Sequence, residues 1–225
     1  MKTSWKIEVP QLVVIAAMFA AAALAWPTAP ARIPVHWNIN GLVDRYGGRF
    51  EGLLLMPLVA LAIYVLMLVL PRIDPGRANY ARFSGAYTVI RITVLGIFAA
   101  FDVGLHVWLR TGHLNVATFA PVVVGVMAIV LGSVLGRVKP NWFVGIRTPW
   151  TLSSRKSWTR THQVGGWVFI GVGLATVGSA FLGPRLAFWV MIAGLMGGAL
   201  VLVVYSYLLW RQDPDKVAPT GRFES

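Results

Sequence analysis

Six long apolar stretches, separated by polar segments, run along the 225-residue chain. Each is about as long as the roughly 17 to 25 helical residues that are needed to cross about 30 Å of hydrocarbon. The pattern therefore predicts an all-α, polytopic integral membrane protein with six transmembrane helices. Their predicted bounds are 9–26, 53–70, 83–109, 116–136, 164–183 and 186–210.

The composition supports a membrane location. Hydrophobic residues make up 57% of the chain and charged residues 12%, and the mean hydropathy is +0.69. Soluble domains carry about a quarter charged residues, so the lipid bilayer is the expected surrounding of this chain. The chain has no cysteine, which excludes disulfides, thiolate metal sites and thiol catalysis.

The distribution of lysine and arginine predicts the orientation of the helices. Fourteen of the 20 basic residues fall on the side that holds both termini and the segment 137–163, and five fall on the side of the segment 27–52. Because cytoplasmic loops are enriched in basic residues, both termini are expected in the cytoplasm. This bias and anionic headgroups explain the net charge of +12, and no direct nucleic-acid binding is expected.

The first apolar stretch permits a second interpretation. Lys2 and Lys6 precede it, and the small residues Ala23 and Ala25 stand near its end, as in a secretory signal with a cleavage site. The first helix is therefore either retained or removed, and the rest of the topology is the same in both cases.

The acidic residues are too few and too scattered for a recognisable catalytic centre. Of the eight carboxylates, Asp102 alone falls within a predicted helix. Neither a phosphate-binding glycine loop nor a zinc-protease motif is present, and Ser153 and Ser154 have no evident base, so they are interpreted as ordinary loop residues. We expect no enzyme, with no catalytic, cofactor-binding or metal-binding residue.

Polar residues within the predicted third helix call for a structural explanation. A charge inside the bilayer costs at least about 2.5 to 3.5 kcal/mol and needs a partner or a use. Arg91 and Asp102 lie on one stripe but about 16 Å apart along the axis, so each needs a partner elsewhere. Either Arg91 reaches toward the headgroups and Asp102 bonds across a helix interface, or the two form an ion path with His106, which shares a helix face with Asp102.

The outer loop offers further polar groups near this helix. His36, Asn38 and Asp44 are expected to be able to approach Asp102 and His106. A metal site is the less favoured interpretation, because the ligand spacing is not that of a known site.

The inner loop alternates basic and aromatic residues, which is typical of a segment at headgroup level. Pro140 and Pro149 exclude one continuous helix, so residues 141–148 are predicted to form a turn held by side-chain hydrogen bonds. Thr159 or Thr161 is expected to cap the fifth helix.

Two roles remain open for this loop. It is either a rigid clamp, in which Arg147 binds carbonyls at a helix C-terminus, or a surface for a partner.

Small residues at helical spacing predict close helix packing. Gly132 with Gly136, and Gly194 with Gly198, form two such faces. Packing within the chain is preferred over homodimerisation.

Two motifs resemble a known family. The inner loop is similar to the signature of the SdpI family of bacterial membrane immunity proteins, and the outer loop resembles a domain of unknown function that often precedes it. The matching inner residues are Asn141, Gly145, Ile146, Arg147, Thr148, Pro149, Trp150, Leu152, Trp158, Thr161, His162 and Gly166. The matching outer residues are Pro34, His36, Trp37, Asn38, Gly41 and Asp44.

The resemblance implies a multi-pass protein of the bacterial cytoplasmic membrane in two domains. The first is a two-helix module, 9–70, with the extracytoplasmic loop 27–52. The second is a four-helix module, 83–210, with the cytoplasmic motif loop 137–163. A polar cytoplasmic tail, 211–225, follows.

The resemblance also implies a role in toxin immunity and in signal transduction as part of the response to a toxic substance. A secreted, membrane-active peptide toxin and a small DNA-binding autorepressor, captured at the membrane, are the implied partners. The outer motif is then the candidate for toxin contact and the inner motif for structure or signalling.

Two other functions stay open at this point. One is a small transporter or ion-conducting protein that uses Arg91, Asp102 and His106, although the sequence shows no pair of broken helices. The other is a membrane-bound enzyme with a pocket around Arg147 and His162.

Overall fold

The computed structural model describes residues 4–217 and contains six long helices, as predicted. All six are long and apolar enough to cross a membrane. They are α1 (Trp5–Ala25), α2 (Leu55–Ile73), α3 (Ser84–Thr111), α4 (Val116–Leu135), α6 (Arg155–Ala180) and α7 (Pro184–Arg211). Residues 218–225 of the predicted tail lie outside the described residues.

Shorter elements occupy the connections. An antiparallel hairpin, β1 (Ile33–Trp37) and β2 (Val43–Gly47), and the π-helical turn η1 (Phe50–Leu54) lie between α1 and α2. The 3-10 turn η2 (Arg77–Phe83) precedes α3, and the single turn α5 (Pro149–Leu152) precedes α6. The hydrophobic pattern predicted no strand in this segment. Its two strands are short, and the turn residues Asn40 and Gly41 between them are typical of a loop.

Two helices begin four or more residues before the predicted start. α1 begins at Trp5, so Glu8 lies within the helix and Asp102 is not the only acidic residue in a span. α6 begins at Arg155, where the Ser154 side chain accepts a hydrogen bond from the backbone of Ser157. The expected cap at Thr159 or Thr161 is therefore wrong, because an earlier hydroxyl already satisfies the free N–H groups of the first turn.

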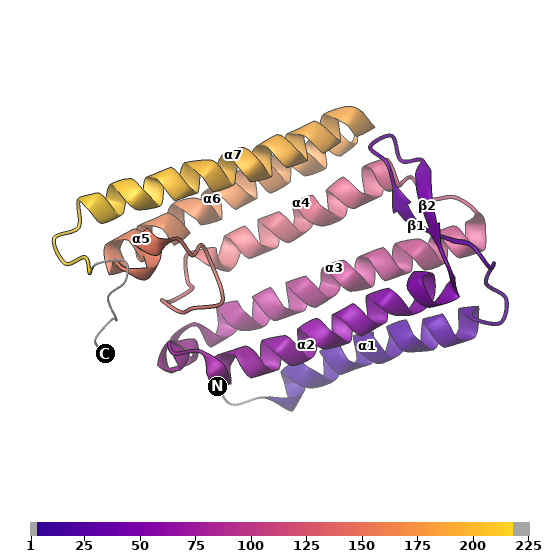
Figure 1. Ribbon diagram of the computed structural model, residues 1–225, viewed down its shortest axis with the longest axis horizontal. Coiled ribbons are helices and arrows are strands. Elements are labelled where there is room, and N and C mark those ends of the chain that lie inside the picture. Colours follow the sequence, from indigo (N-terminus) through magenta and orange to yellow (C-terminus); the bar gives the residue numbers. More distant parts are fainter. Residues whose placement is uncertain (1–3, 218–225) are drawn as a thin grey trace.

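The helices form two groups of three that α3 and α4 join. α1, α2 and α3 pack together, α4, α6 and α7 pack together, and α3 also packs on α4 (Figure 1). The start of α1, η2, α5 and the end of α7 lie at one end of the bundle, and the hairpin lies at the other. We call these the inner and outer ends, following the predicted orientation.

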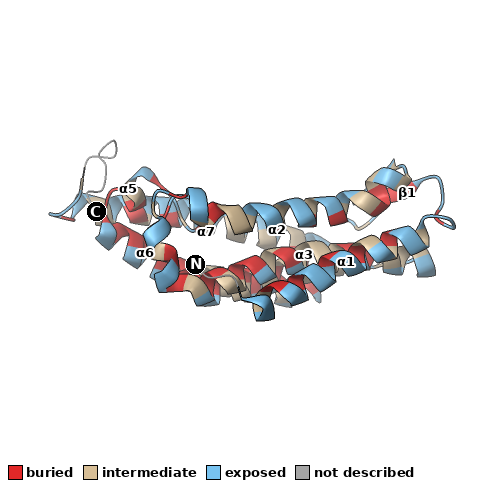
Figure 2. Cartoon of the chain, turned by 90° about the horizontal axis from the view of Figure 1, so that it is seen from below, coloured by how far each residue is buried: buried red, intermediate tan, exposed pale blue. Residues whose placement is uncertain are grey.

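Lipid is the natural solvent for the outward faces. Figure 2 shows exposed residues along the outer sides of the long helices and buried residues toward their neighbours. Large apolar side chains such as Trp189, Met196 and Leu200 on α7 are exposed. In water this surface would be an extended apolar patch, so the fold agrees with a protein embedded in a bilayer.

Glycines bring α4 and α6 into close contact. A Cβ atom on Gly132 would lie 2.6 Å from the Gly166 carbonyl oxygen, and one on Gly166 would lie 2.7 Å from the Gly132 oxygen. A Cβ atom on Gly194 or Gly198 of α7 would meet valine side chains of α6. The predicted role of the glycine faces in packing within the chain is confirmed.

Candidate functional site

Asn38 shapes the turn of the outer hairpin. Its side-chain oxygen accepts hydrogen bonds from the backbone N–H groups of Asn40 and Leu42, at 3.0 and 3.1 Å. Gly41 has a φ of +76°, and a Cβ atom there would lie 2.9 Å from that of Ala117 on α4. Only glycine therefore suits both the turn and its contact with α4.

His36 and Asp44 face each other across the two strands of the hairpin. The distance from His36 Nδ1 to Asp44 Oδ1 is 2.6 Å, and both side chains are exposed to solvent. Their partners are thus each other, and in the described residues no hydrogen bond or ion pair joins them to Asp102 or His106. The predicted approach of the outer motif to Asp102 and His106 stays a prediction.

The hairpin tip links the two groups of helices. Arg185 at the start of α7 donates from Nε to the Asn40 side-chain oxygen at 3.2 Å, and Gly41 rests on Ala117 at the start of α4. The hairpin belongs in sequence to the α1–α2 connection, so it reaches over the outer end of the bundle to the other group.

An apolar pocket of about 130 Å³ lies beneath the hairpin. Its lining comes from the hairpin, from η1 and the start of α2, from α3, and from the start of α4. Trp37, Phe101 and Phe119 give it aromatic walls, and Arg45 and Glu51 are its charged residues. Sequence reasoning missed this pocket, because its lining comes from five separate segments.

Asp102 and His106 form a pair on α3, in which Asp102 is buried and His106 is half-buried. His106 Nδ1 lies 2.9 Å from the Asp102 carbonyl oxygen and 3.7 Å from its Oδ2. Within residues 4–217, Asp102 Oδ1 and His106 Nε2 have no hydrogen-bond partner. No group of three or more histidine or acidic residues able to hold a metal occurs in this part of the chain.

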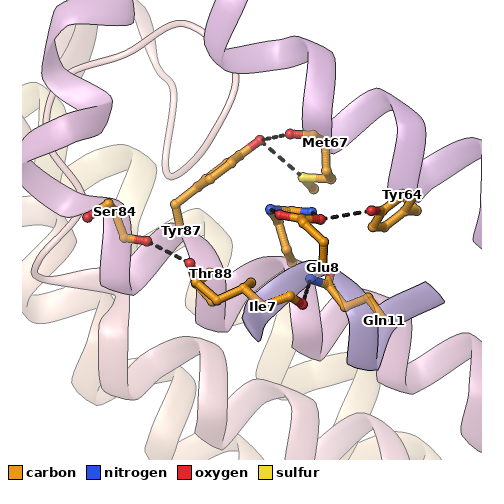
Figure 3. Close-up of polar contacts among 9 residues, drawn as sticks. Ile7, Glu8, Gln11, Tyr64, Met67, Ser84, Tyr87 and Thr88 are labelled. Carbon is orange, nitrogen blue, oxygen red and sulfur yellow. Dashed lines mark hydrogen bonds and ion pairs between the residues drawn. The ribbon is translucent and has the colours of Figure 1, made fainter. Parts of the chain in front are cut away.

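Arg91 is paired with Glu8 near the inner end of α1, α2 and α3. Its Nη1 and Nη2 donate to the two Glu8 oxygens at 2.9 and 2.6 Å, and the Arg91 side chain is 1% exposed. Tyr64 of α2 donates to Glu8 Oε2 at 2.8 Å, and Figure 3 shows the two side chains facing each other. Arg91 therefore does not reach toward the headgroups. Glu8 was missed because it stands just before the apolar run.

Asn141 organises the inner loop. Its side-chain oxygen accepts from the N–H groups of Phe143 and Val144, and its amide nitrogen donates to the carbonyls of Lys139 and Val144. The side chain is buried. The predicted turn held by side-chain hydrogen bonds over residues 141–148 is confirmed.

Asp74 joins this loop to the connection between α2 and α3. It accepts from the backbone N–H groups of Gly76 at 2.6 Å and of Trp142 at 3.1 Å, and from the Tyr80 hydroxyl at 2.8 Å. Asn79 adds a hydrogen bond to the Pro140 carbonyl at 2.8 Å. Asp74 had no motif to reveal it, since Trp142, its partner in the inner loop, is 68 residues away in the chain.

His162 lies buried against the inner loop. Its Nε2 accepts the Ile146 N–H at 3.0 Å, so Nδ1 carries the proton that is donated to the Trp158 carbonyl at 2.8 Å. The ring stacks on Trp158, whose indole N–H donates to the Val138 carbonyl. Gly145, with a φ of +112°, leaves the space that His162 fills.

Hydroxyl groups tie the loop to α7. Thr148 caps α5, and its hydroxyl lies 3.0 Å from that of Ser206 on α7. Ser154 caps α6 and donates to Asp213 beyond the end of α7. Ser153 and Ser154 are both buried, so the interpretation of them as ordinary loop residues is wrong. The Ser153 hydroxyl donates to the Pro149 carbonyl within α5, whereas the role of Ser154 depends on Asp213, which is 59 residues away in the chain.

The loop also has an exposed rim. Arg147 is exposed and donates from Nη1 to the Trp142 carbonyl at 2.8 Å. Its acceptor is thus in the loop itself and not at a helix C-terminus, as the clamp hypothesis expected. Trp142 and Phe143 are exposed beside it, whereas Trp158 is core.

Comparison with known proteins agrees with this architecture. Residues 137–206 match the SdpI/YfhL protein family. Residues 13–61 match a domain of unknown function, DUF1648. The chain is also similar to the "Immunity protein SdpI" of Bacillus subtilis (strain 168), with 20% identity over 217 residues, which cover 92% of this chain and 97% of that protein. No solved structure matches the chain.

The SdpI/YfhL segment includes the whole inner loop from Asn141 to His162 and ends at Ser206, the partner of Thr148. The DUF1648 segment includes the hairpin. These segments fall within the predicted domains 9–70 and 83–210. The division itself stays a prediction, since α3 packs against helices of both groups.

Proposed function

We propose that this protein protects the bacterium that makes it against a secreted, membrane-active peptide toxin. The observation that carries the proposal is the similarity to an immunity protein over nearly the full length of both chains. The protein acts in the cytoplasmic membrane, with both termini inside the cell. Protection of this kind needs recognition and no catalysis, so we propose no enzymatic step.

The hairpin is the proposed contact for the toxin. It carries the outer motif, and Leu42 and Tyr46 on it are exposed apolar side chains that a peptide in the outer leaflet would meet. The exposed pair of His36 and Asp44 adds an imidazole and a carboxylate to this surface. A surface with this combination suits a peptide that is partly apolar and partly polar.

The inner loop is the proposed output. The hairpin tip rests on α4 and near the start of α7, and both helices lead to the inner loop, α4 by its end and α7 through Ser206. In this proposal, peptide binding changes the contacts of the tip and the two helices carry the change inward. The exposed rim of Trp142, Phe143 and Arg147 then captures a small DNA-binding autorepressor.

Survival of a toxin-sensitive bacterium tests the proposal. Cells that express the wild-type chain are expected to outgrow cells with an empty vector when a membrane-active peptide toxin is present. Asp44→Ala removes the partner of His36 and is expected to reduce survival, whereas Asp215→Ala, an exposed aspartate at the inner end, is the matched control. Equal survival of wild type and empty vector would refute immunity.

One observation favours a second function, ion or proton transport. Asp102 Oδ1 and His106 Nε2 are buried polar atoms without partners in the described residues, and such groups inside a membrane often mark ion pathways. Arg91 is no longer part of this candidate, because Glu8 neutralises it. Flux through wild-type proteoliposomes that Asp102→Asn abolishes would support transport, and equal background flux in both would reject it.

A further inference from the structure

The pocket beneath the hairpin has the size of one large apolar side chain. Its volume is about 130 Å³, and an engineered apolar cavity of about 150 Å³ in another protein binds benzene. Phe101 and Phe119 stand edge to face at 5.8 Å, and Trp37 lies on the hairpin side. Aromatic walls of this kind favour an aromatic or branched aliphatic group.

Two charged residues, Arg45 and Glu51, lie at the opening of the pocket. Arg45 Nη1 lies 2.6 Å from Glu51 Oε1, and their side chains are 57% and 34% exposed. Both residues line the pocket, as does Leu55, which is exposed at the surface. The pocket therefore reaches the surface next to a group that donates hydrogen bonds and a group that accepts them.

This combination distinguishes a peptide from a lipid chain. A peptide presents an N–H donor and a C=O acceptor beside each side chain, and these complement the carboxylate of Glu51 and the guanidinium of Arg45. An acyl chain offers neither group along its length. We propose that this pocket binds one bulky apolar side chain of a peptide, while Arg45 and Glu51 bind the adjoining backbone; the proposal rests on the immunity function above.

The roof of the pocket is held in place before any ligand arrives. At its base, Ile33 packs so closely on Gly52 that a Cβ atom there would lie 2.6 Å from Ile33 Cγ2. At its tip, Asn40 is bonded to Arg185 and Gly41 rests on Ala117. A site that is already formed loses less conformational entropy on binding, so a single side chain suffices as an anchor.

Thiol labelling of the full-length protein in phosphatidylcholine nanodiscs tests occupancy directly. Because the chain has no cysteine, Leu114→Cys places a single thiol in the pocket lining, and Ile39→Cys places one on the exposed turn of the hairpin away from it. N-acetyl-phenylalanine amide is expected to slow labelling of L114C about tenfold at a concentration about ten times its Kd. Labelling of I39C is expected to stay unchanged.

Two results would overturn the proposal. One is equal labelling of L114C with and without the amide. The other is protection by n-octanol but not by N-acetyl-phenylalanine amide, which would assign the pocket to an acyl chain.

Filling the pocket gives a second, independent test. Val116→Phe adds a ring to the lining, whereas Val126→Phe adds the same ring to an exposed position of the same helix. V116F is expected to lose the protection that N-acetyl-phenylalanine amide gives to L114C and also to lose toxin survival, and V126F to keep both. Unchanged protection and survival in a folded V116F would contradict the proposal. If wild-type cells show no immunity but the amide still protects L114C, the pocket stands and the proposed function fails.

Discussion

Glu8 and Arg91 are 83 residues apart in the chain, yet their side chains form a bidentate ion pair. The distances from Arg91 Nη1 and Nη2 to the two Glu8 oxygens are 2.9 and 2.6 Å. The pair joins α1 to α3 inside the membrane-spanning part of the bundle, and Tyr64 of α2 adds a third contact. All three helices of the first group thus meet at one polar centre. The Arg91 guanidinium also lies 5.6 Å from the centre of the Tyr64 ring.

Removal of one partner of this pair should destabilise the bundle strongly. Arg91→Leu leaves Glu8 buried without its cation, and we expect a loss of about 3–5 kcal/mol. The double variant Glu8→Leu with Arg91→Leu should recover most of the loss, since neither charge is then left alone. Thermal unfolding in detergent of the four proteins of this cycle measures the coupling. Purely additive losses would show that the two residues do not act as a pair.

The same pair predicts that α1 stays attached to the mature protein. Cleavage after Ala25 would remove Glu8 and leave Arg91 unpaired in the membrane, which is costly. Intact-mass measurement of the protein from bacterial membranes should therefore include residues 5–25. A mature chain that begins near Trp26 would show instead that Arg91 finds another partner.

The close contact of α4 and α6 predicts opposite effects for two glycines of α6. Gly166→Ala places a methyl group against the Gly132 carbonyl, and we expect a loss of about 1–3 kcal/mol from overpacking. Gly171→Ala meets no atom within 4 Å, so the better helix propensity of alanine should stabilise the protein by about 0.5–1 kcal/mol. The melting temperatures of the two variants, compared with that of the wild type, test these opposite effects. Equal shifts would mean that α4 and α6 are not in contact.

Asp74 should hold the two inner connections together. Asp74→Ala leaves the buried Tyr80 hydroxyl without its acceptor, which costs about 1–3 kcal/mol, and it also leaves the part-buried Trp142 N–H without one. Tyr80→Phe removes only one of these bonds and should have the smaller effect. Hydrogen exchange at the Trp142 amide should accelerate in D74A. If the Trp142 amide still exchanges slowly in D74A, Asn141 alone is sufficient to hold the loop in its conformation.

The predicted orientation can be tested with single thiols. Leu42→Cys on the hairpin should react with a membrane-impermeant maleimide in intact cells, whereas Phe143→Cys on the inner loop should react only after the membrane is permeabilised. Both side chains are exposed, so accessibility depends on the side of the membrane. The reverse result would exchange the proposed sensor and output.

Much of the local structure follows from short-range sequence patterns. The six helices follow from apolar length, and the turn at residues 141–148 follows from its prolines and from Asn141. Segments that depend on distant residues were predicted poorly. The hairpin is an example, because its two strands are five residues each and it rests on helices more than 70 residues further along the chain.

The candidate sites show the same division. The sequence identified Arg91, Asp102 and His106 as polar residues in a span, because a charge in an apolar run stands out against its neighbours. It did not identify Glu8 as the partner of Arg91, nor Asp74 and Asp213 as partners of the inner loop. These carboxylates stand at the ends of apolar runs, where charged residues are ordinary.

The sequence by itself determined that this chain is a membrane protein of six helices with two motif-bearing loops, since bilayer thickness and apolar length are local properties. Only the tertiary structure decided that Glu8 neutralises Arg91, that Asp74 holds the inner loop, and that a hairpin covers an apolar pocket at the outer end. These features arise where segments distant in the chain meet. The free energy of a buried polar group depends on which partner the fold brings within hydrogen-bonding distance.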